Sequence, residues 1–174
     1  GRKKTNFKRK TNYDFYSLNE AASILKISPS QVATLIHLKI LDRDNEFLTP
    51  IKIKRISLDA LKNMLESEEY VSLQNASEKL SCRMNWFNQY WCKTGFLEIK
   101  DLVYWKLVKK SQLYEIIKLK EEYLTGAEAS SLLGMRHSHI TNLQTQSLII
   151  PYYFGKTDKK IRLFKRSDVL GLMA

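Results

Sequence analysis

The chain has 174 residues and 44% of them are hydrophobic, which is enough to bury a core in one ordinary domain or in several very small ones. No apolar run is long enough to span a membrane, and no hydrophobic signal segment follows the basic start, so we expect neither a membrane protein nor a secreted one. The net charge of +11 favours a polyanionic partner, nucleic acid first and an anionic membrane second.

Residues 1–13 are predicted to form a basic arm. Six of the first ten residues are Lys or Arg, and such a run is typically a disordered tail. Removing these six charges from +11 leaves about +5, so the basic character is distributed along the chain. The arm is expected to follow a DNA backbone or to enter a minor groove. Its candidate phosphate contacts are Arg2, Lys3, Lys4, Lys8, Arg9 and Lys10. The ragged basic start also indicates a piece of a longer polypeptide.

Three segments of the sequence align with one another without gaps. They are spaced by 55 and then by 53 residues. The aligned columns are Ala21/Ala76/Ala129, Leu25/Leu80/Leu133, Ile27/Cys82/Met135, Val32/Phe87/Ile140 and Leu35/Tyr90/Leu143. Self-similarity at a fixed period is the mark of a repeat architecture. We therefore predict three units, at 14–68, 69–121 and 122–174.

Each unit is predicted to contain two short helices, a β-hairpin and a closing helix. The first two helices are expected where apolar residues recur at helical spacing. In chain order they are Leu18–Leu25 and Pro29–Leu38, then Gln74–Leu80 and Met84–Cys92, then Ala127–Leu133 and His137–Gln146. The hairpins are expected at Phe47–Ile56, at Leu97–Val108, and at Ile149–Phe154 with Ile161–Lys165. Two helices joined by a turn of three or four residues are typical of a helix-turn-helix.

Capping signals mark several of these boundaries. Ser28 offers a capping hydroxyl to the helix that begins at Pro29. Gly134 stands where the first helix of the third unit ends, a place that favours a left-handed residue. A Ser also follows a basic pair or near-pair at the start of each closing helix. We expect these residues, Ser57, Ser111 and Ser167, to be N-caps.

With these motifs in place, each unit resembles the winged helix-turn-helix of the MerR and excisionase type. The match is best in EAASILKISPSQVATLI at Glu20–Ile36. It is looser in EASSLLGMRHSHITNL at Glu128–Leu143 and holds only in outline in LQNASEKLSCRMNWFNQYW at Leu73–Trp91. The terminal FKRSDVLGLM is similar to the family's strand-to-helix ending. The resemblance covers Tyr16 to Ala174. It implies three tandem winged helix-turn-helix units, a mainly α fold with small β-hairpin wings (α+β).

The resemblance also limits the expected function. The long dimerisation helix and the effector domain of MerR regulators are missing, so a ligand-sensing activator is not expected. Several excisionase-like units in a row are similar to the C-terminal regions of TniQ-type proteins, which choose insertion sites for transposons.

The outward residues of the second helices are the candidate base contacts, because a recognition helix presents its N-terminal outer face to the major groove. Amides and hydroxyls suit base edges, although short polar side chains also cover any exposed helix face. The candidates are Ser30, Gln31 and Thr34, then Asn85, Asn88 and Gln89, then His137, Ser138, His139, Thr141 and Asn142.

The second helix of unit two is unusually aromatic. We expect Phe87, with Tyr90 or Trp91, to enter the core of the unit and Trp86 to lie outside it. A neighbouring unit is the favoured partner of Trp86, and another protein or a base step are the alternatives.

The wings carry most of the remaining positive charge. Lys and Arg there would neutralise phosphates and give affinity with little sequence information. The candidates recur at equivalent places in the units and are Lys52, Lys54, Arg55, Lys106, Lys109, Lys110, Lys156, Lys159, Lys160, Arg162, Lys165 and Arg166.

Residues with catalytic or metal-binding potential are sparse. Cys82 and Cys92 have no His beside them, so we expect reduced thiols and neither a zinc site nor a disulfide framework. His137 and His139 point to different sides of a helix and make a poor metal pair. No phosphate-binding glycine loop occurs. We expect no enzyme, no cofactor and no metal.

The sequence therefore predicts sequence-specific binding of double-stranded DNA through three winged helices on an extended, asymmetric site. Each unit would cover ~10 base pairs. The expected setting is a bacterial cytoplasm and nucleoid, where the chain acts as a monomer on DNA in target-site selection, excision, integration or transcription control. Other proteins of such a complex are possible partners. Two alternatives remain open: an assembly adaptor that uses the divergent middle unit, and a winged-helix RNA binder.

Overall fold

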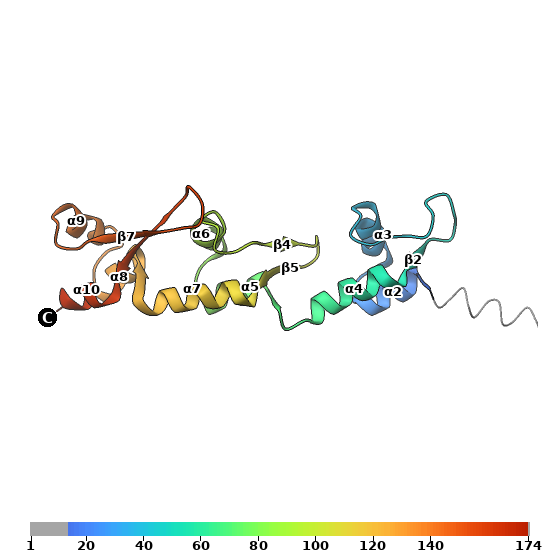
Figure 1. Ribbon diagram of the computed structural model, residues 1–174, viewed down its shortest axis with the longest axis horizontal. Helices are drawn as coiled ribbons and strands as arrows, with labels where there is room; N and C mark the ends of the chain where they lie inside the picture. Colours follow the sequence, from blue (N-terminus) through green and yellow to red (C-terminus); the bar gives the residue numbers. More distant parts are fainter. Residues whose placement is uncertain (1–13, 174) are drawn as a thin grey trace, which may run out of the picture. The chain divides into compact units, whose positions relative to one another are not determined.

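The computed structural model describes residues 14–173 and contains helices with small antiparallel sheets (Figure 1). This mixture agrees with an α+β fold. The chain divides into two compact units, with the boundary between Glu68 and Glu69. The basic arm predicted for residues 1–13 lies outside the described residues. Within residues 14–173, no helix combines the length and the apolar character needed to cross a bilayer.

Residues 14–68 of the first compact unit form two strands and three helices. In chain order they are β1 (Phe15–Ser17), α2 (Leu18–Leu25), α3 (Pro29–His37), β2 (Lys52–Lys54) and α4 (Arg55–Glu66). Ser17 caps α2 through a capping box with Glu20, and Ser28 caps α3 as expected, with Pro29 at the first helical position.

The prediction of a hairpin within Phe47–Ile56 is wrong. Strand β2 pairs with β1, so that Phe15 lies opposite Lys54, and the segment before β2 contributes one isolated bridge between Arg43 and Ile53. The Asn45 side chain accepts a hydrogen bond from the Phe47 backbone N–H and turns the chain there. Pro50 also brings no backbone donor to a strand ladder. The sequence between these turns therefore forms a loop.

The second compact unit repeats this order of elements twice. The first pass contains β3 (Tyr70–Ser72), α5 (Leu73–Lys79), α6 (Met84–Phe87), the π-helix η1 (Asn88–Cys92), β4 (Lys100–Asp101), β5 (Lys106–Lys109) and α7 (Lys110–Glu122). The second contains β6 (Tyr123–Thr125), α8 (Gly126–Leu132), α9 (His139–Thr145), β7 (Pro151–Phe154), β8 (Ile161–Lys165) and α10 (Arg166–Gly171). The sheet orders are β3-β5-β4 and β6-β8-β7. We call the three passes repeats one (14–68), two (69–122) and three (123–173).

The buried positions follow the aligned columns of the sequence. Ala21, Ala76 and Ala129 are each 0% exposed, and so are the residues of the column Val32/Phe87/Ile140. The strand pairing recurs as well, since Tyr70 lies opposite Lys109 and Tyr123 lies opposite Lys165, as Phe15 does opposite Lys54. The small alanine lets the second helix cross the first closely, and the apolar residue of the second helix fills the contact.

A left-handed residue ends the first helix of every repeat. Lys26, Ser81 and Gly134 have φ of 57°, 48° and 70°. In each case the next backbone N–H bonds back to the carbonyl five residues earlier, as in Ile27 to Ala22 at 3.1 Å. This is the Schellman arrangement, and it satisfies carbonyls that the helix end leaves open. The prediction for Gly134 is confirmed, while Lys26 and Ser81 hold the same conformation with a Cβ in place.

The N-caps predicted for the closing helices are wrong. Helices α4, α7 and α10 begin one or two residues before the expected serines. Their N-cap positions are Lys54, Lys109 and Lys165, two or three residues before those serines, and these lysines make no side-chain cap bond. Each helix starts directly where its strand ends, because the strand's last residue already has extended φ and ψ. The Ser57 hydroxyl instead accepts a bond from the Asp42 N–H at 2.9 Å.

Repeat two contains one extra residue in its second helix. The Lys93 N–H bonds to the Asn88 carbonyl at 2.9 Å, five residues back, and this widened turn is η1. The turn moves Trp91, 1% exposed, into the place that Leu35 holds in repeat one, and leaves Tyr90 partly exposed. Of the two partners expected for Phe87 in the core, Trp91 is the buried one. The aligned column Leu35/Tyr90/Leu143 is therefore wrong in repeat two, where Trp91 and not Tyr90 is equivalent to Leu35.

Strand β8 joins the cores of repeats two and three. Successive side chains of a strand point to opposite faces. Ile161 and Leu163 accordingly pack into the cluster of Phe87 and Trp91, while Phe164 packs into the separate cluster of repeat three. The loop between β7 and β8 also binds repeat two, because the Lys156 N–H donates to the Thr94 carbonyl at 2.7 Å and the Thr157 hydroxyl donates to the Lys93 carbonyl at 2.8 Å. This hairpin is therefore held by its neighbour.

We predict that Gly134→Ala lowers the free energy of unfolding by about 1 kcal/mol, because an L side chain strains a residue with positive φ. A Cβ at Gly134 would have no atom within 4 Å, so the loss comes from the backbone alone. Gly171→Ala is the matched control, since its Cβ also meets open space but its φ is not positive. Urea unfolding of both variants measures the difference. Equal free energies of unfolding for the Gly134→Ala and Gly171→Ala variants would contradict the left-handed conformation of Gly134.

Candidate nucleic-acid interface

The candidate base contacts of repeat one lie on α3 and bond to its first turn. The Gln31 side-chain oxygen accepts from the Ser28 N–H at 2.9 Å, and the Ser28 hydroxyl accepts in return from the Gln31 N–H at 3.2 Å. The Thr34 hydroxyl donates to the Ser30 carbonyl at 3.1 Å. Ser30 is exposed, while Gln31 and Thr34 are half-buried. Gln31 and Thr34 thus also hold the helix start in shape.

In repeat two, Asn85, Asn88 and Gln89 are all exposed on α6 and η1. Gln89 accepts a bond from the Lys93 ammonium at 3.0 Å and lines a cleft between repeats two and three. The polar face of this helix is therefore partly turned toward repeat three.

In repeat three, α9 begins at His139, later than expected, so His137 and Ser138 precede the helix. A buried side chain explains this start. The Ser130 hydroxyl, 0% exposed on α8, donates to the His137 carbonyl at 3.1 Å and accepts from the Ile140 N–H at 3.3 Å. This serine caps α9 from the neighbouring helix, and no sequence signal near His137 indicates it. Thr141 and Asn142 are exposed on α9, and His139 is half-buried.

Several of the expected phosphate contacts have partners inside the protein. Arg162 donates to Gln144 at 2.8 Å and to Thr141 at 3.2 Å, and so ties β8 to α9. Arg166 donates to the Glu121 and Lys120 carbonyls at the end of α7. Lys156 pairs with Glu115 at 2.8 Å, and the Arg55 guanidinium lies 4.6 Å from the Tyr16 ring centroid. These residues serve packing within or between repeats.

Other candidate cations are exposed and have no side-chain partner among residues 14–173. They are Lys54, Lys106, Lys109 and Lys159. Lys52, Lys110 and Lys165 are half-buried, and the exposed Lys160 donates to the Gly155 carbonyl at 2.7 Å. The candidates Arg2, Lys3, Lys4, Lys8, Arg9 and Lys10 lie outside the described residues. Among the candidate phosphate contacts in residues 14–173, the exposed cations without a side-chain partner are therefore lysines at strand ends and in a loop.

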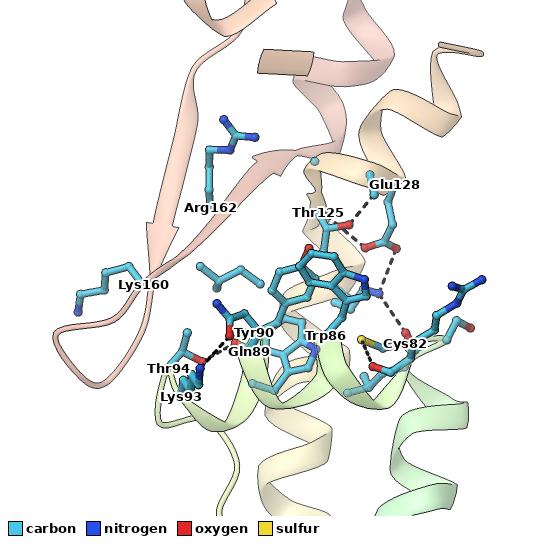
Figure 2. Close-up of a pocket in the computed structure, with 18 of the residues that line it drawn as sticks. Cys82, Trp86, Gln89, Tyr90, Lys93, Thr94, Thr125, Glu128, Lys160 and Arg162 are labelled. Carbon is cyan, nitrogen blue, oxygen red and sulfur yellow. Dashed lines mark hydrogen bonds and ion pairs between the residues drawn. The ribbon is translucent and has the colours of Figure 1, made fainter. Parts of the chain in front are cut away.

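A cleft of about 920 Å³ separates repeats two and three (Figure 2). Trp86 and Tyr90 form one wall, with ring centroids 5.3 Å apart and ring planes 24° apart. Trp86 is 49% exposed, and Figure 2 shows the two rings between the helix of repeat two and the strand of Lys160 and Arg162. Trp86 thus faces repeat three across the open cleft. The prediction that Trp86 would pack directly against a neighbouring unit is wrong.

The rear of this cleft is held by one ion pair. The Lys120 ammonium lies 3.0 Å from the Glu128 carboxylate and 3.4 Å from the Leu80 carbonyl, so α7 connects the turn of repeat two to α8. Glu128 also completes a capping box with Thr125, which begins α8. The spacing Thr125-x-x-Glu128 is a capping-box signal that the sequence displays, and it locates this corner of the cleft.

Burial governs the two thiols. It raises the pKa of the Cys92 thiol to about 11. It also raises the pKa of the Cys82 thiol, while the nearby Lys120 charge lowers that pKa in part. Both cysteines are free and half-buried. Among residues 14–173, no group of three or more His, Cys, Asp or Glu side chains is placed to hold a metal ion.

Comparisons with known proteins found no family model, no curated protein and no solved structure that matches this chain.

We predict that Cys92 reacts with iodoacetamide at pH 8 roughly 100-fold more slowly in the folded chain than in the unfolded one, because only the thiolate attacks. Its folded pKa of about 11 exceeds the ordinary value of 9.0. The same difference stabilises the fold below pH 9, and this contribution is lost as the pH rises toward 11. Peptide mass spectrometry, with guanidinium-unfolded chain as control, follows both cysteines. Equal rates would contradict the burial.

Proposed function

We propose that this chain binds double-stranded DNA in a sequence-dependent way, and that repeats one, two and three are tandem winged helix-turn-helix units without catalytic activity. The observation that carries the proposal is the threefold recurrence of one helix pair. In each repeat a left-handed turn sets the second helix across the first, with one apolar side buried and a row of amides and hydroxyls on the other side. A helix displayed in this way suits the major groove.

Base reading is assigned to α3 and α9. In α9 the amide of Asn142 is exposed in the middle of the helix, and such an amide can pair with adenine through two hydrogen bonds. In α3, Ser30 is the exposed candidate, and Gln31 holds the first turn. The second helix of repeat two lines the cleft with Trp86 and Gln89, so its polar face has less room for a duplex.

Backbone binding is assigned to the exposed lysines that have no side-chain partner within residues 14–173. Lys106 and Lys109 lie on β5, Lys54 stands at the end of β2, and Lys159 lies in the β7–β8 loop. These side chains can reach phosphates without breaking an internal contact. The net charge of +11 adds long-range attraction to a polyanion. A site read by unlike helices in one chain needs neither a palindrome nor a dimer, and the transposition and transcription settings are equally compatible with it.

We predict that duplex binding weakens steeply with salt. Each neutralised phosphate contributes about −0.9 to the slope of log K against log salt, so eight contacts give roughly −7. Fluorescence anisotropy on a duplex selected from a random library measures the slope. A hairpin RNA of the same length is the control. Equal affinity for this RNA would replace the DNA proposal by the RNA-binding alternative.

We further predict that two kinds of variant separate reading from affinity. Asn142→Ala should cost ~1–3 kcal/mol on the selected duplex and little on random DNA. Gln146→Ala, at the far end of α9, is its matched control and should change neither. The double variant Lys106→Gln and Lys159→Gln should weaken both duplexes equally and reduce the salt slope by about 2. If Asn142→Ala weakened binding to the selected duplex and to random DNA equally, direct base reading by α9 would be contradicted.

A further inference from the structure

The aromatic pair in the cleft is not explained by the core of repeat two. Phe87 lies inside, and the widened turn of η1 places Trp91 in the core with it and leaves Tyr90 stacked with Trp86 on the cleft wall. Half of the Trp86 side chain faces solvent, although the chain encloses two other tryptophans more fully. Two flat rings stacked with their planes 24° apart form a platform for another planar group.

The surroundings of the rings select a negatively charged partner. The cations on the cleft lining are Arg83, Lys93, Lys120, Lys159, Lys160 and Arg162. Glu128 is the acidic residue of that lining, and Lys120 neutralises it at 3.0 Å. Arg83 is exposed at the start of α6 and has no side-chain bond within residues 14–173. A planar, apolar face combined with anionic groups is the chemistry of a nucleotide.

The platform favours an unpaired nucleotide over a duplex. In a duplex the base faces are covered by their neighbours in the stack, so an aromatic ring gains nothing from them. Proteins that bind single strands use aromatic side chains to stack bases and basic grooves to follow the phosphates. We propose that this cleft binds an unpaired stretch of DNA, with one base stacked on Trp86 and phosphates near Arg83 and Lys93. This inference rests on the proposed function for the choice of DNA as the polymer.

A single-stranded DNA octamer of mixed sequence tests the proposal. We expect it to bind the wild-type chain and to quench tryptophan emission, because a stacked base quenches Trp86. The Trp105→Phe variant should retain the quenching, which assigns the signal to the cleft. Free ATP at the same nucleotide concentration should quench far less, because it has no neighbouring nucleotides whose phosphates, spaced along a strand, could reach Arg83 and Lys93. Equal quenching by ATP would overturn the strand assignment in favour of a free nucleotide.

Substitutions then separate stacking from charge. Trp86→Ala should weaken octamer binding roughly 5- to 150-fold, as the removal of one stacking partner does, and Trp86→Phe should restore most of it. Tyr114→Ala is the matched control, since Tyr114 is 57% exposed on α7 and does not line the cleft. Arg83→Gln should reduce the salt slope for the octamer by about 0.7 while leaving the quenching at saturation intact.

The outcomes distinguish this inference from the duplex proposal. Octamer binding that depends on Trp86 without any duplex binding would remove the proposed function and keep the cleft. Duplex binding without octamer binding would overturn the proposal that the cleft binds single-stranded DNA. The same proposal would be overturned if the Trp86→Ala variant bound the octamer as tightly as the wild-type chain. An RNA octamer bound tenfold more tightly than the DNA octamer would overturn the assignment to DNA.

Discussion

The tight left-handed turn between the two helices of each repeat is the constraint on which the other features depend. Lys26, Ser81 and Gly134 hold positive φ at equivalent positions. The turn folds the second helix back across a buried alanine, and this crossing decides which side of the second helix is covered. Two of the three turns keep a side chain where glycine would be less strained, so the close crossing must supply enough packing to outweigh that strain.

One inserted residue gives repeat two a different character. The wider turn of η1 rotates the later part of the helix, so Trp91 enters the core and Tyr90 moves beside Trp86. After this turn the chain passes through Gly95, with φ of 84°. A Cβ there would lie 2.9 Å from the Thr157 methyl carbon, so the glycine allows the β7–β8 loop to approach. The insertion therefore connects the aromatic cleft with the close packing of repeats two and three.

Positive charge is shared between internal packing and the surface. Arg162 and Arg166 tie strands and helices together within the second compact unit, and Lys120 bridges its two repeats at the rear of the cleft. Lys54, Lys106, Lys109 and Lys159 keep exposed side chains. A basic residue at an equivalent repeat position can therefore have either role, and its neighbours decide which.

The recurring order of helices, the buried alanine column and the place of Gly134 could all be predicted from the residues, because helical periodicity and capping chemistry are local and are repeated in each copy. The α+β character and the helix Leu18–Leu25 follow from the same local signals. The starts of the closing helices were misjudged by two or three residues, because a strand that runs directly into a helix needs no serine cap. Three-dimensional packing was needed to show that β2 pairs with β1, that Ser130 caps α9, that Arg162 binds α9, and that Trp86 and Tyr90 line one cleft. Each of these contacts joins residues that are distant in sequence or displaced by a single inserted residue, and no local pattern records which distant partner packing will bring near.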